Sequence, residues 1–235
     1  MSDSRYVYMQ VYSHKRAVFE ALKSFRNFYK TEEITVLSDD GEDFTSICKA
    51  AKARYVHATT RTTQGTMTIE AVHEWLKRIY EHCISVDSEW VLLFEEDVRT
   101  LRKIRHFPAT DAGGPRMNAY SPELTRKLIE EFGDKPYGYG LAGGAAWKRQ
   151  AYIDAYNGNR KIDDYVQYDD RVAVWADIPL TLLFHINGFT YSEWDEISEI
   201  THARAPIVRD SAFDHAYKYW VDKEFDEELL GEFNQ

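Results

Sequence analysis

The chain has 235 residues, which is enough for one large domain or two small ones with a sizeable core. Its composition, 44% hydrophobic and 29% charged, is typical of a globular protein, and its net charge of -10 argues against binding to nucleic-acid backbones or anionic lipid. Its two cysteines are too few for a disulfide framework or a structural zinc site. No apolar run approaches the ~20 residues of a membrane span, and no secretory leader pattern opens the sequence. We therefore expect a cytoplasmic protein, or one domain of a longer chain.

The first hundred residues alternate between strand-like and helix-like patterns. A β-favouring run ends at Ser13, which we expect to cap a helix whose apolar residues from Val18 to Phe28 fall at helical spacing. Together the patterns predict strands at 6–12, 34–37, 54–57 and 90–94, with helices from 17, at 44–53 and at 69–83. Alternation of this kind is typical of a parallel sheet flanked by helices.

The second half of the chain has a less regular pattern. Ser121 and Pro122 begin a helix that Gly133 ends, since Ser is a favoured N-cap and Pro fits the first turn. Four glycines lie among apolar residues at 137–147, which favours a strand with close backbone approach. We also expect helices at 148–156 and 163–175, a strand at 180–186 and a short helix within 221–235, with 99–105 open between strand and helix. No linker-like stretch divides the chain, so we predict one α/β domain with a mostly parallel central sheet.

Three consecutive acids follow the most apolar strand. The run from Trp90 to Phe94 has no polar residue and leads directly into Glu95, Glu96 and Asp97. Such a run indicates a strand buried on both faces, and ligands of open α/β sheets bind outside the carboxyl ends of their strands. Because alternate side chains of a strand share a face, we expect Glu95 and Asp97 to point the same way. The pattern predicts a divalent-metal site, with a solvated acidic loop as the alternative.

The order of these features resembles that of the nucleotide-diphospho-sugar glycosyltransferases of the GT-A fold. The resemblance rests on strands ending at Ser13-His14 and at Ser38-Asp39-Asp40-Gly41, a turn at Gln64-Gly65 before a long helix, and an apolar strand ending in Glu95-Glu96-Asp97. The last is similar to the family's D-x-D metal motif, with Glu in its first place. The match covers 6–97 well and the rest loosely. It implies a single domain over 1–235, with a nucleotide-sugar-binding half at 1–100 and an acceptor and catalytic half at 101–235.

The resemblance also implies which residues hold the donor. Asp97 matches a direct metal ligand, and Glu95, whose side chain is one methylene longer than that of Asp, matches a metal or ribose contact. A downstream histidine often completes the metal shell in the family; His202 is the favoured residue here, with His185 and His215 as alternatives. The expected ion is Mn²⁺ or Mg²⁺, since both suit oxygen ligands. The other nucleotide-sugar contacts that the match implies are Tyr12, Ser13, Asp39, Asp40 and Arg61.

Further expectations concern the acceptor side. In inverting members of the family, an acidic pair near the start of a helix supplies the base that deprotonates the acceptor hydroxyl. Asp169-Asp170 matches that pair, which implies Asp170 as the base, with Asp169 and Asp164 behind it, although acids also suit an ordinary first turn. The glycines of 139–147 are similar to a segment that lines the sugar site, the alternative being a tight bend packed on a helix. For Trp147 and Trp194 two predictions stay open: the indole ring stacks on a sugar, or it packs in the hydrophobic core.

The implied function is metal-dependent transfer of a sugar from a nucleotide diphosphate, a UDP-sugar before a GDP-sugar, to a hydroxyl of a glycan or glycoprotein. One alternative is a sugar-nucleotide pyrophosphorylase, which would place a basic Gly-rich loop after the first strand; His14-Lys15-Arg16 has the charge without the glycine. The other is a non-catalytic module that binds a glycan or a nucleotide. The expected partners are therefore a nucleotide-sugar donor and a glycan acceptor, without nucleic acid.

Overall fold

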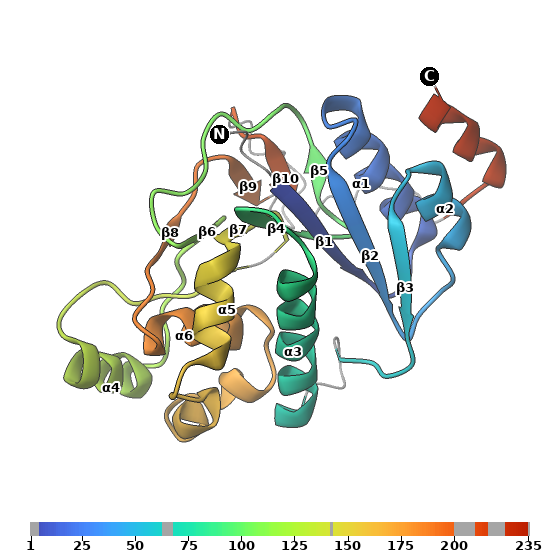
Figure 1. The fold of residues 1–235 in the computed structure, drawn as a ribbon. Coiled ribbons are helices and arrows are strands. Elements are labelled where there is room, and N and C mark those ends of the chain that lie inside the picture. Colours follow the sequence, from blue (N-terminus) through green and yellow to red (C-terminus); the bar gives the residue numbers. More distant parts are fainter. Residues whose placement is uncertain (1–4, 63–67, 142, 200–209, 216–223, 235) are drawn as a thin grey trace.

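The centre of the molecule is a seven-stranded sheet with the order β3-β2-β1-β4-β7-β6-β8 (Figure 1). The structure is a computed structural model that describes residues 5–62, 68–141, 143–199, 210–215 and 224–234. Strands β1 to β4 are parallel to one another, and β7 runs antiparallel between β4 and β6. The predicted mostly parallel α/β sheet is therefore confirmed. The strands of this sheet are β1 (Arg5–Val11), β2 (Glu33–Asp39), β3 (Arg54–Ala58), β4 (Trp90–Glu95), β6 (Ala112–Gly114), β7 (Ala146–Lys148) and β8 (Tyr191–Glu193).

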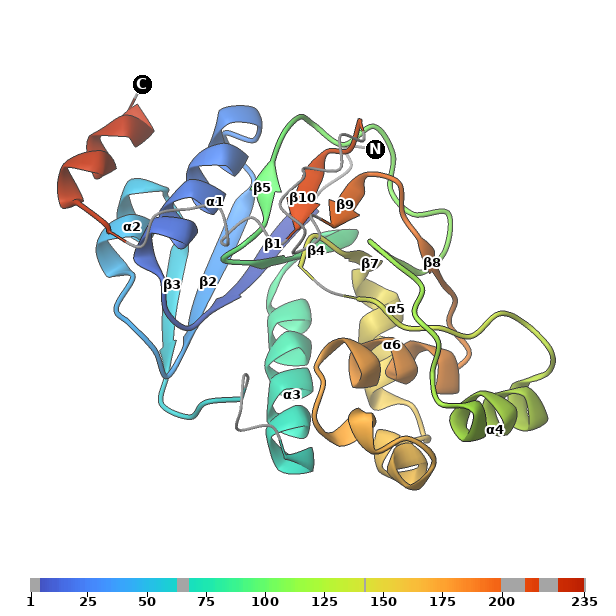
Figure 2. The ribbon, with the colours of Figure 1, turned by 180° about the vertical axis from the view of Figure 1, so that it is seen from behind.

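Helices cover both faces of this sheet (Figures 1 and 2). Because side chains alternate along a strand, Val7 and Met9 of β1 join the apolar cluster that contains α1 and α2, whereas Tyr8 joins the cluster that contains α3. None of the described helices is long and apolar enough to cross a membrane. The helices are α1 (Lys15–Phe28), α2 (Thr45–Ala50), α3 (Ile69–Ser85), α4 (Pro122–Phe132), α5 (Arg149–Asn157) and α6 (Asp177–Ile186), with 3-10 helices η1 (Ile162–Tyr168), η2 (Asp170–Ala173) and η4 (Glu227–Asn234).

A smaller sheet follows the carboxyl end of β4. It has the order β5-β10-β9, formed by β5 (Arg99–Thr100), β10 (Phe213–His215) and β9 (Ile197–Glu199). Glu196, just before β9, is fully buried and pairs with Arg102 at 2.6 Å and Arg105 at 3.3 Å. Both arginines also pair with Asp210, so the residues after β5 are tied to those that precede β9 and β10. The small sheet thereby brings the C-terminal part of the chain to the end of β4.

Several local predictions are wrong, for identifiable reasons. Residues 177–186 form helix α6 rather than a strand at 180–186: every residue from Ile178 to Ile186 is buried, and a helix buried all round shows no polar face in its sequence. The N-cap of α1 is His14, whose Nδ1 accepts a hydrogen bond from the Ala17 amide, rather than Ser13. The expected helix at 163–175 is the pair of short 3-10 helices η1 and η2. The expected strand at 137–147 is reduced to β7 and one isolated bridge.

Candidate functional site

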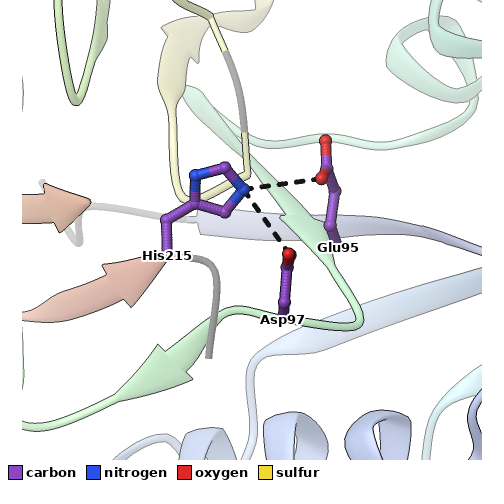
Figure 3. Close-up of side chains that lie close together, drawn as sticks. All are labelled: Glu95, Asp97 and His215. Carbon is purple, nitrogen blue, oxygen red and sulfur yellow. Dashed lines mark ion pairs between the residues drawn. The ribbon is translucent and has the colours of Figure 1, made fainter. Parts of the chain in front are cut away.

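Three side chains with metal-binding atoms meet at the carboxyl end of β4 (Figure 3). Nε2 of His215 lies 3.6 Å from Oε2 of Glu95 and 3.5 Å from Oδ1 of Asp97. One ligand atom from each residue lies within 4.8 Å of the other two. The side chains of Asp97 and His215 are nearly buried, whereas 39% of the Glu95 side chain is exposed. The cluster is therefore accessible from the side of Glu95.

The two acids share a face because of the way β4 ends. Glu95 is the last residue of the strand, and its carbonyl oxygen accepts a hydrogen bond from the amide of Val98 at 3.2 Å, which closes a tight turn. Glu96 and Asp97 lie in this turn and not in the strand, so it is the turn that brings the carboxylate of Asp97 close to that of Glu95. Glu96, between them, is buried.

His215 is positioned by its strand and by a glycine. On the preceding residue, Asp214, the carboxylate accepts hydrogen bonds from Ser198 Oγ at 2.6 Å and from Arg99 Nη2 at 3.2 Å, which fixes β10 to both of its neighbours. A Cβ atom on Gly143 would lie 2.9 Å from Cδ2 of the His215 ring. A side chain at that position would therefore displace the imidazole, so the glycine-rich segment is part of the structure of the metal cluster.

The donor set fits a divalent cation. Carboxylate oxygens and an imidazole nitrogen together suit Mn²⁺, and carboxylate oxygens suit Mg²⁺. Two acids held this close together repel each other, and a cation between them removes that repulsion. His202, the favoured histidine in the sequence analysis, lies outside the described residues. His185 is buried in α6, where its Nε2 lies 2.9 Å from the carbonyl oxygen of Gly138 and desolvation lowers its pKa to about 4.

Two of the predicted nucleotide contacts touch each other just beyond β1. The guanidinium of Arg61 lies 3.8 Å from the centroid of the Tyr12 ring, a cation–π contact. The carbonyl oxygen of Tyr12 accepts a hydrogen bond from the Glu42 amide at 2.8 Å, which holds the turn after β1 against the turn after β2. Ser13 is half-buried in the first turn and Asp40 is exposed in the second. These turns therefore present polar and aromatic groups near the carboxyl ends of β1 and β2.

Asp39, another of the predicted nucleotide contacts, is engaged with protein groups. Its carboxylate is fully buried, pairs with Nη1 of Arg78 at 2.7 Å, and accepts hydrogen bonds from the Thr62 amide at 2.9 and 3.0 Å. Arg78 also donates to the carbonyl oxygen of Thr60 at 2.8 Å. Asp39 and Arg78 thus hold the residues on both sides of Arg61, so this buried pair fixes the backbone that carries Arg61.

The predicted acidic pair divides into a buried and an exposed residue. Asp169 is buried and accepts hydrogen bonds from Nε and Nη2 of Arg171 at 2.8 and 2.7 Å and from the Ser121 amide at 2.9 Å. Burial alone would raise the pKa of Asp169, but the hydrogen bonds from Arg171 and Ser121 outweigh it and lower the pKa. A carboxylate so occupied is a poor general base. Asp170 is exposed at the first position of η2, and Asp164 is exposed in η1.

One acid near the metal cluster was missed by the sequence analysis. Asp177 is the first residue of α6, and its carboxylate pairs with Nη2 of Arg116 at 3.1 Å. Burial raises the pKa of Asp177 and the charge of Glu95 acts in the same direction, which places the two acids within electrostatic range. One turn further on, Thr181 accepts hydrogen bonds from the amides of Gly140 and its neighbour at 3.2 Å. An Asp just before an apolar run is a helix-start signal, but the run was interpreted as a strand.

The glycine-rich segment and the two candidate tryptophans pack against protein groups. A Cβ on Gly140 would lie 2.3 Å from the carbonyl oxygen of Arg116, and one on Gly144 would lie 1.9 Å from Cδ1 of Ile197. Close packing therefore explains these glycines, although the contacts are with loops and β9 rather than with a helix. Trp147 and Trp194 are buried, so both belong to the core.

The comparisons with known proteins identify the fold. No protein-family model matches the chain, and the comparison with curated proteins found no similar sequence. A complex of the galactosyltransferase LgtC with donor and acceptor sugar analogues is 12% identical, with a TM-score of 0.52 over 96% of this chain and 99% of LgtC. An active-site mutant of LgtC gives a TM-score of 0.55 at 12% identity over 97% and 95% of the two chains. The glycosyltransferase GlyE of Streptococcus pneumoniae TIGR4 gives 0.53 at 16% identity over 97% of this chain, which spans 60% of GlyE.

The chain therefore has the GT-A fold of these glycosyltransferases, as the order of its motifs predicted. At this level of identity the likeness establishes the fold alone.

Proposed function

We propose that this protein is a metal-dependent glycosyltransferase. It transfers a sugar from a nucleotide-diphosphate donor, with a UDP-sugar as the first choice, to a hydroxyl of a glycan or glycoprotein acceptor. The observation that carries the proposal is the cluster of Glu95, Asp97 and His215 at the carboxyl end of β4 within a GT-A fold. Residues 1–100 supply the nucleotide-sugar-binding half, and 101–235 supply the acceptor half.

The donor side is formed by residues of the first half together with His215 of β10. Glu95, Asp97 and His215 would hold Mn²⁺ or Mg²⁺. A divalent ion bound there offsets the negative charge that develops on the diphosphate leaving group. The stacked Tyr12 and Arg61 supply an aromatic face and a positive charge for the nucleotide. Ser13 and Asp40, in the adjoining turns, supply hydrogen-bonding groups for the nucleoside.

Two carboxylates are candidates for the base if transfer inverts configuration. Asp177 lies within electrostatic range of Glu95, and its raised pKa makes it a stronger proton acceptor while it is ionised. Asp170 is the base that the resemblance implies, and its exposed carboxylate is accessible to an acceptor. The carboxylate of Asp169 is paired with Arg171, so we assign it a role in holding the turn around Arg171 and not the role of the base.

The test is a thermal-shift panel of UDP, GDP, CDP, TDP and UMP, each with and without Mn²⁺ or Mg²⁺. A ligand at ~100 times its dissociation constant adds ~2.7 kcal/mol of stability, which raises Tm by roughly 5–10 °C for a chain of this size. We expect UDP to stabilise the wild type only with metal, and Asp97→Ala to lose that shift. The control is Asp154→Asn, because Asp154 is an exposed acid on α5 whose described contact is with Gln150.

The outcomes separate the competing functions. Failure of every nucleotide to shift Tm would contradict the glycosyltransferase proposal and favour a solvated acidic loop. Nucleotide binding that needs no metal, together with no breakdown of any sugar nucleotide, would favour a non-catalytic binding module. A larger shift with GDP than with UDP would keep the reaction and change the donor.

A further inference from the structure

One large aromatic side chain is exposed just before helix α6. Trp175 is 51% exposed, whereas every other tryptophan in the described part of the chain is buried. Its neighbour Val174 is 46% exposed. An exposed indole is costly to keep in water, because its two faces bury a large apolar area when they are covered. A pair of adjacent exposed apolar residues therefore indicates a surface that something covers.

The turn that carries Trp175 is rigidly held. The amides of Val174 and Trp175 donate to the carbonyl oxygen of Arg171 at 3.1 and 3.0 Å. The guanidinium of Arg171 is fixed in turn by the buried Asp169 at 2.7 Å and by the hydroxyl of Tyr139 at 3.2 Å. Hydrogen bonds therefore fix the turn that carries the indole ring. Little conformational freedom of the backbone is lost when a ligand covers the ring.

The same turn leads into α6, whose first residue, Asp177, lies within electrostatic range of Glu95. Trp175 is two residues before Asp177, whose pairing with Arg116 fixes the start of α6. Thr181 on α6 holds the backbone of the glycine-rich segment at Gly140. The same segment reaches the ring of His215 at Gly143.

We infer that Trp175 is the stacking platform for a sugar ring of the acceptor glycan. This inference rests on the proposed glycosyltransferase function and adds the acceptor contact to it. A pyranose has one face of C–H groups, which packs on an aromatic ring while the hydroxyls on its rim stay free for hydrogen bonds. Trp175 is two residues from Asp177, one of the two candidate bases, so it stands on the acceptor side of the proposed site. The nucleobase is not the expected occupant, because the stacked Tyr12 and Arg61 lie at the ends of β1 and β3, in the other half of the chain.

The test measures glycan binding by wild type and Trp175 variants in the presence of UDP and Mn²⁺. The probe is a printed array of oligosaccharides that end in galactose, glucose, N-acetylglucosamine or N-acetylgalactosamine, followed by titration of the best-bound glycan. We expect Trp175→Ala to weaken binding at least about tenfold, and Trp175→Phe to stay within about threefold, because a phenyl ring keeps the flat face. The matched control is Ile84→Ala, since Ile84 is 53% exposed but lies at the end of α3 that precedes β4.

Two further measurements, Tm and the thermal shift with UDP and Mn²⁺, distinguish a role of Trp175 in glycan binding from a structural role and from a role in donor binding. Trp175→Ala is expected to keep the wild-type Tm and the wild-type thermal shift with UDP and Mn²⁺. Glycan binding by Trp175→Ala that equals wild type would overturn the platform, as would a wild type that binds no glycan on the array while UDP and Mn²⁺ still stabilise it. Loss of the UDP and Mn²⁺ shift in the wild type itself would instead contradict the proposed function.

Discussion

The buried ion pair of Asp39 and Arg78 supports the segment that carries Arg61. Both side chains are nearly inaccessible to water, and their atoms lie 2.7 Å apart. Removing one partner of a buried pair leaves the other charge without compensation, which is more damaging than the absence of the pair. The interaction is therefore a sensitive point for stability.

For this pair, Arg78→Met is predicted to lower the free energy of unfolding by about 3–5 kcal/mol, because Asp39 stays buried and loses its partner. Urea denaturation monitored by circular dichroism measures the change. The control is Lys77→Met, one residue earlier on α3, where the side chain is 53% exposed and pairs only at the surface. A surface pair contributes about 0–1 kcal/mol, so equal losses in the two variants would contradict the prediction.

His82 gives the stability a specific pH dependence. Its ring is packed between those of Tyr6 and Tyr8, with centroids 4.5 and 4.9 Å away, and desolvation lowers its pKa from 6.5 to about 4. The unfolded chain therefore takes up a proton at a higher pH than the folded chain does. Stability is fully present above pH ~6.5 and falls as the pH is lowered toward 4, by up to about 1.4 kcal/mol per pH unit for each such histidine.

The corresponding measurement is Tm between pH 7 and pH 4.5 for wild type and His82→Phe. We expect a smaller fall in the variant, because phenylalanine keeps the ring but does not titrate. His185 acts in the same direction as His82, and Asp177, whose pKa is raised by burial, acts in the opposite one; both are unchanged in this comparison. Equal falls in the two proteins would show that His82 is not responsible.

Asp177 and Asp170 are separated by a kinetic comparison. Loss of a general base reduces turnover by about 10²–10⁴-fold. We expect Asp177→Asn to show that loss of kcat with little change in the donor KM, and Asp170→Asn to stay near wild type. The reverse result would restore Asp170 as the base. Full activity in both variants would indicate transfer with retention of configuration, which requires no such base.

At the scale of elements, the glycine-rich segment connects α6 to the metal cluster through close packing. Gly144 has φ +89 and Gly133 has φ +86, so an alanine is strained at either position. They differ in surroundings: a Cβ on Gly144 would strike Ile197 at 1.9 Å, whereas no atom lies within 4 Å of a Cβ on Gly133. A comparison of alanine at the two positions therefore isolates the contribution of packing to the free energy of unfolding.

From this pair, Gly133→Ala is predicted to lower the free energy of unfolding by about 1–2 kcal/mol through backbone strain alone. Gly144→Ala is predicted to lose at least about 1 kcal/mol more, because Ile197 and β9 must shift to admit the methyl group. Chemical denaturation of both variants measures the difference. Indistinguishable variants would mean that the segment is loosely packed.

The elements also show which sequence signals are sufficient. The short apolar runs of β1, β2 and β4 and the 3.6-residue pattern of α1 and α3 were predictable, because turn residues follow the strands and each of these helices has a polar face. Helix α6 has no polar face, so its apolar run favours strand and helix equally. That ambiguity concealed Asp177, since its significance depends on its place at a helix start.

For the whole molecule, the limit of sequence reasoning lies in long-range contacts. Glu95 and Asp97 are neighbours in the chain, and their spacing predicted their meeting. His215 joins them only because β10 pairs with β5 and β9 in the small sheet, which no local pattern specifies. The residues after β1 and β2 show the same division: the turns at Tyr12 and Asp40 were predictable, but the burial of Asp39 against Arg78 was not.

The GT-A fold and the cluster of Glu95, Asp97 and His215 together carry the proposal that this protein is a metal-dependent glycosyltransferase. The most direct measurement is release of UDP from a panel of UDP-sugars, with water as acceptor, in the presence and absence of Mn²⁺. We expect slow release from at least one UDP-sugar with wild type and Mn²⁺, none after chelation, and a loss of at least about 100-fold in Asp97→Ala and in His215→Ala. Equal release with and without metal, or by wild type and Asp97→Ala, would contradict the proposal.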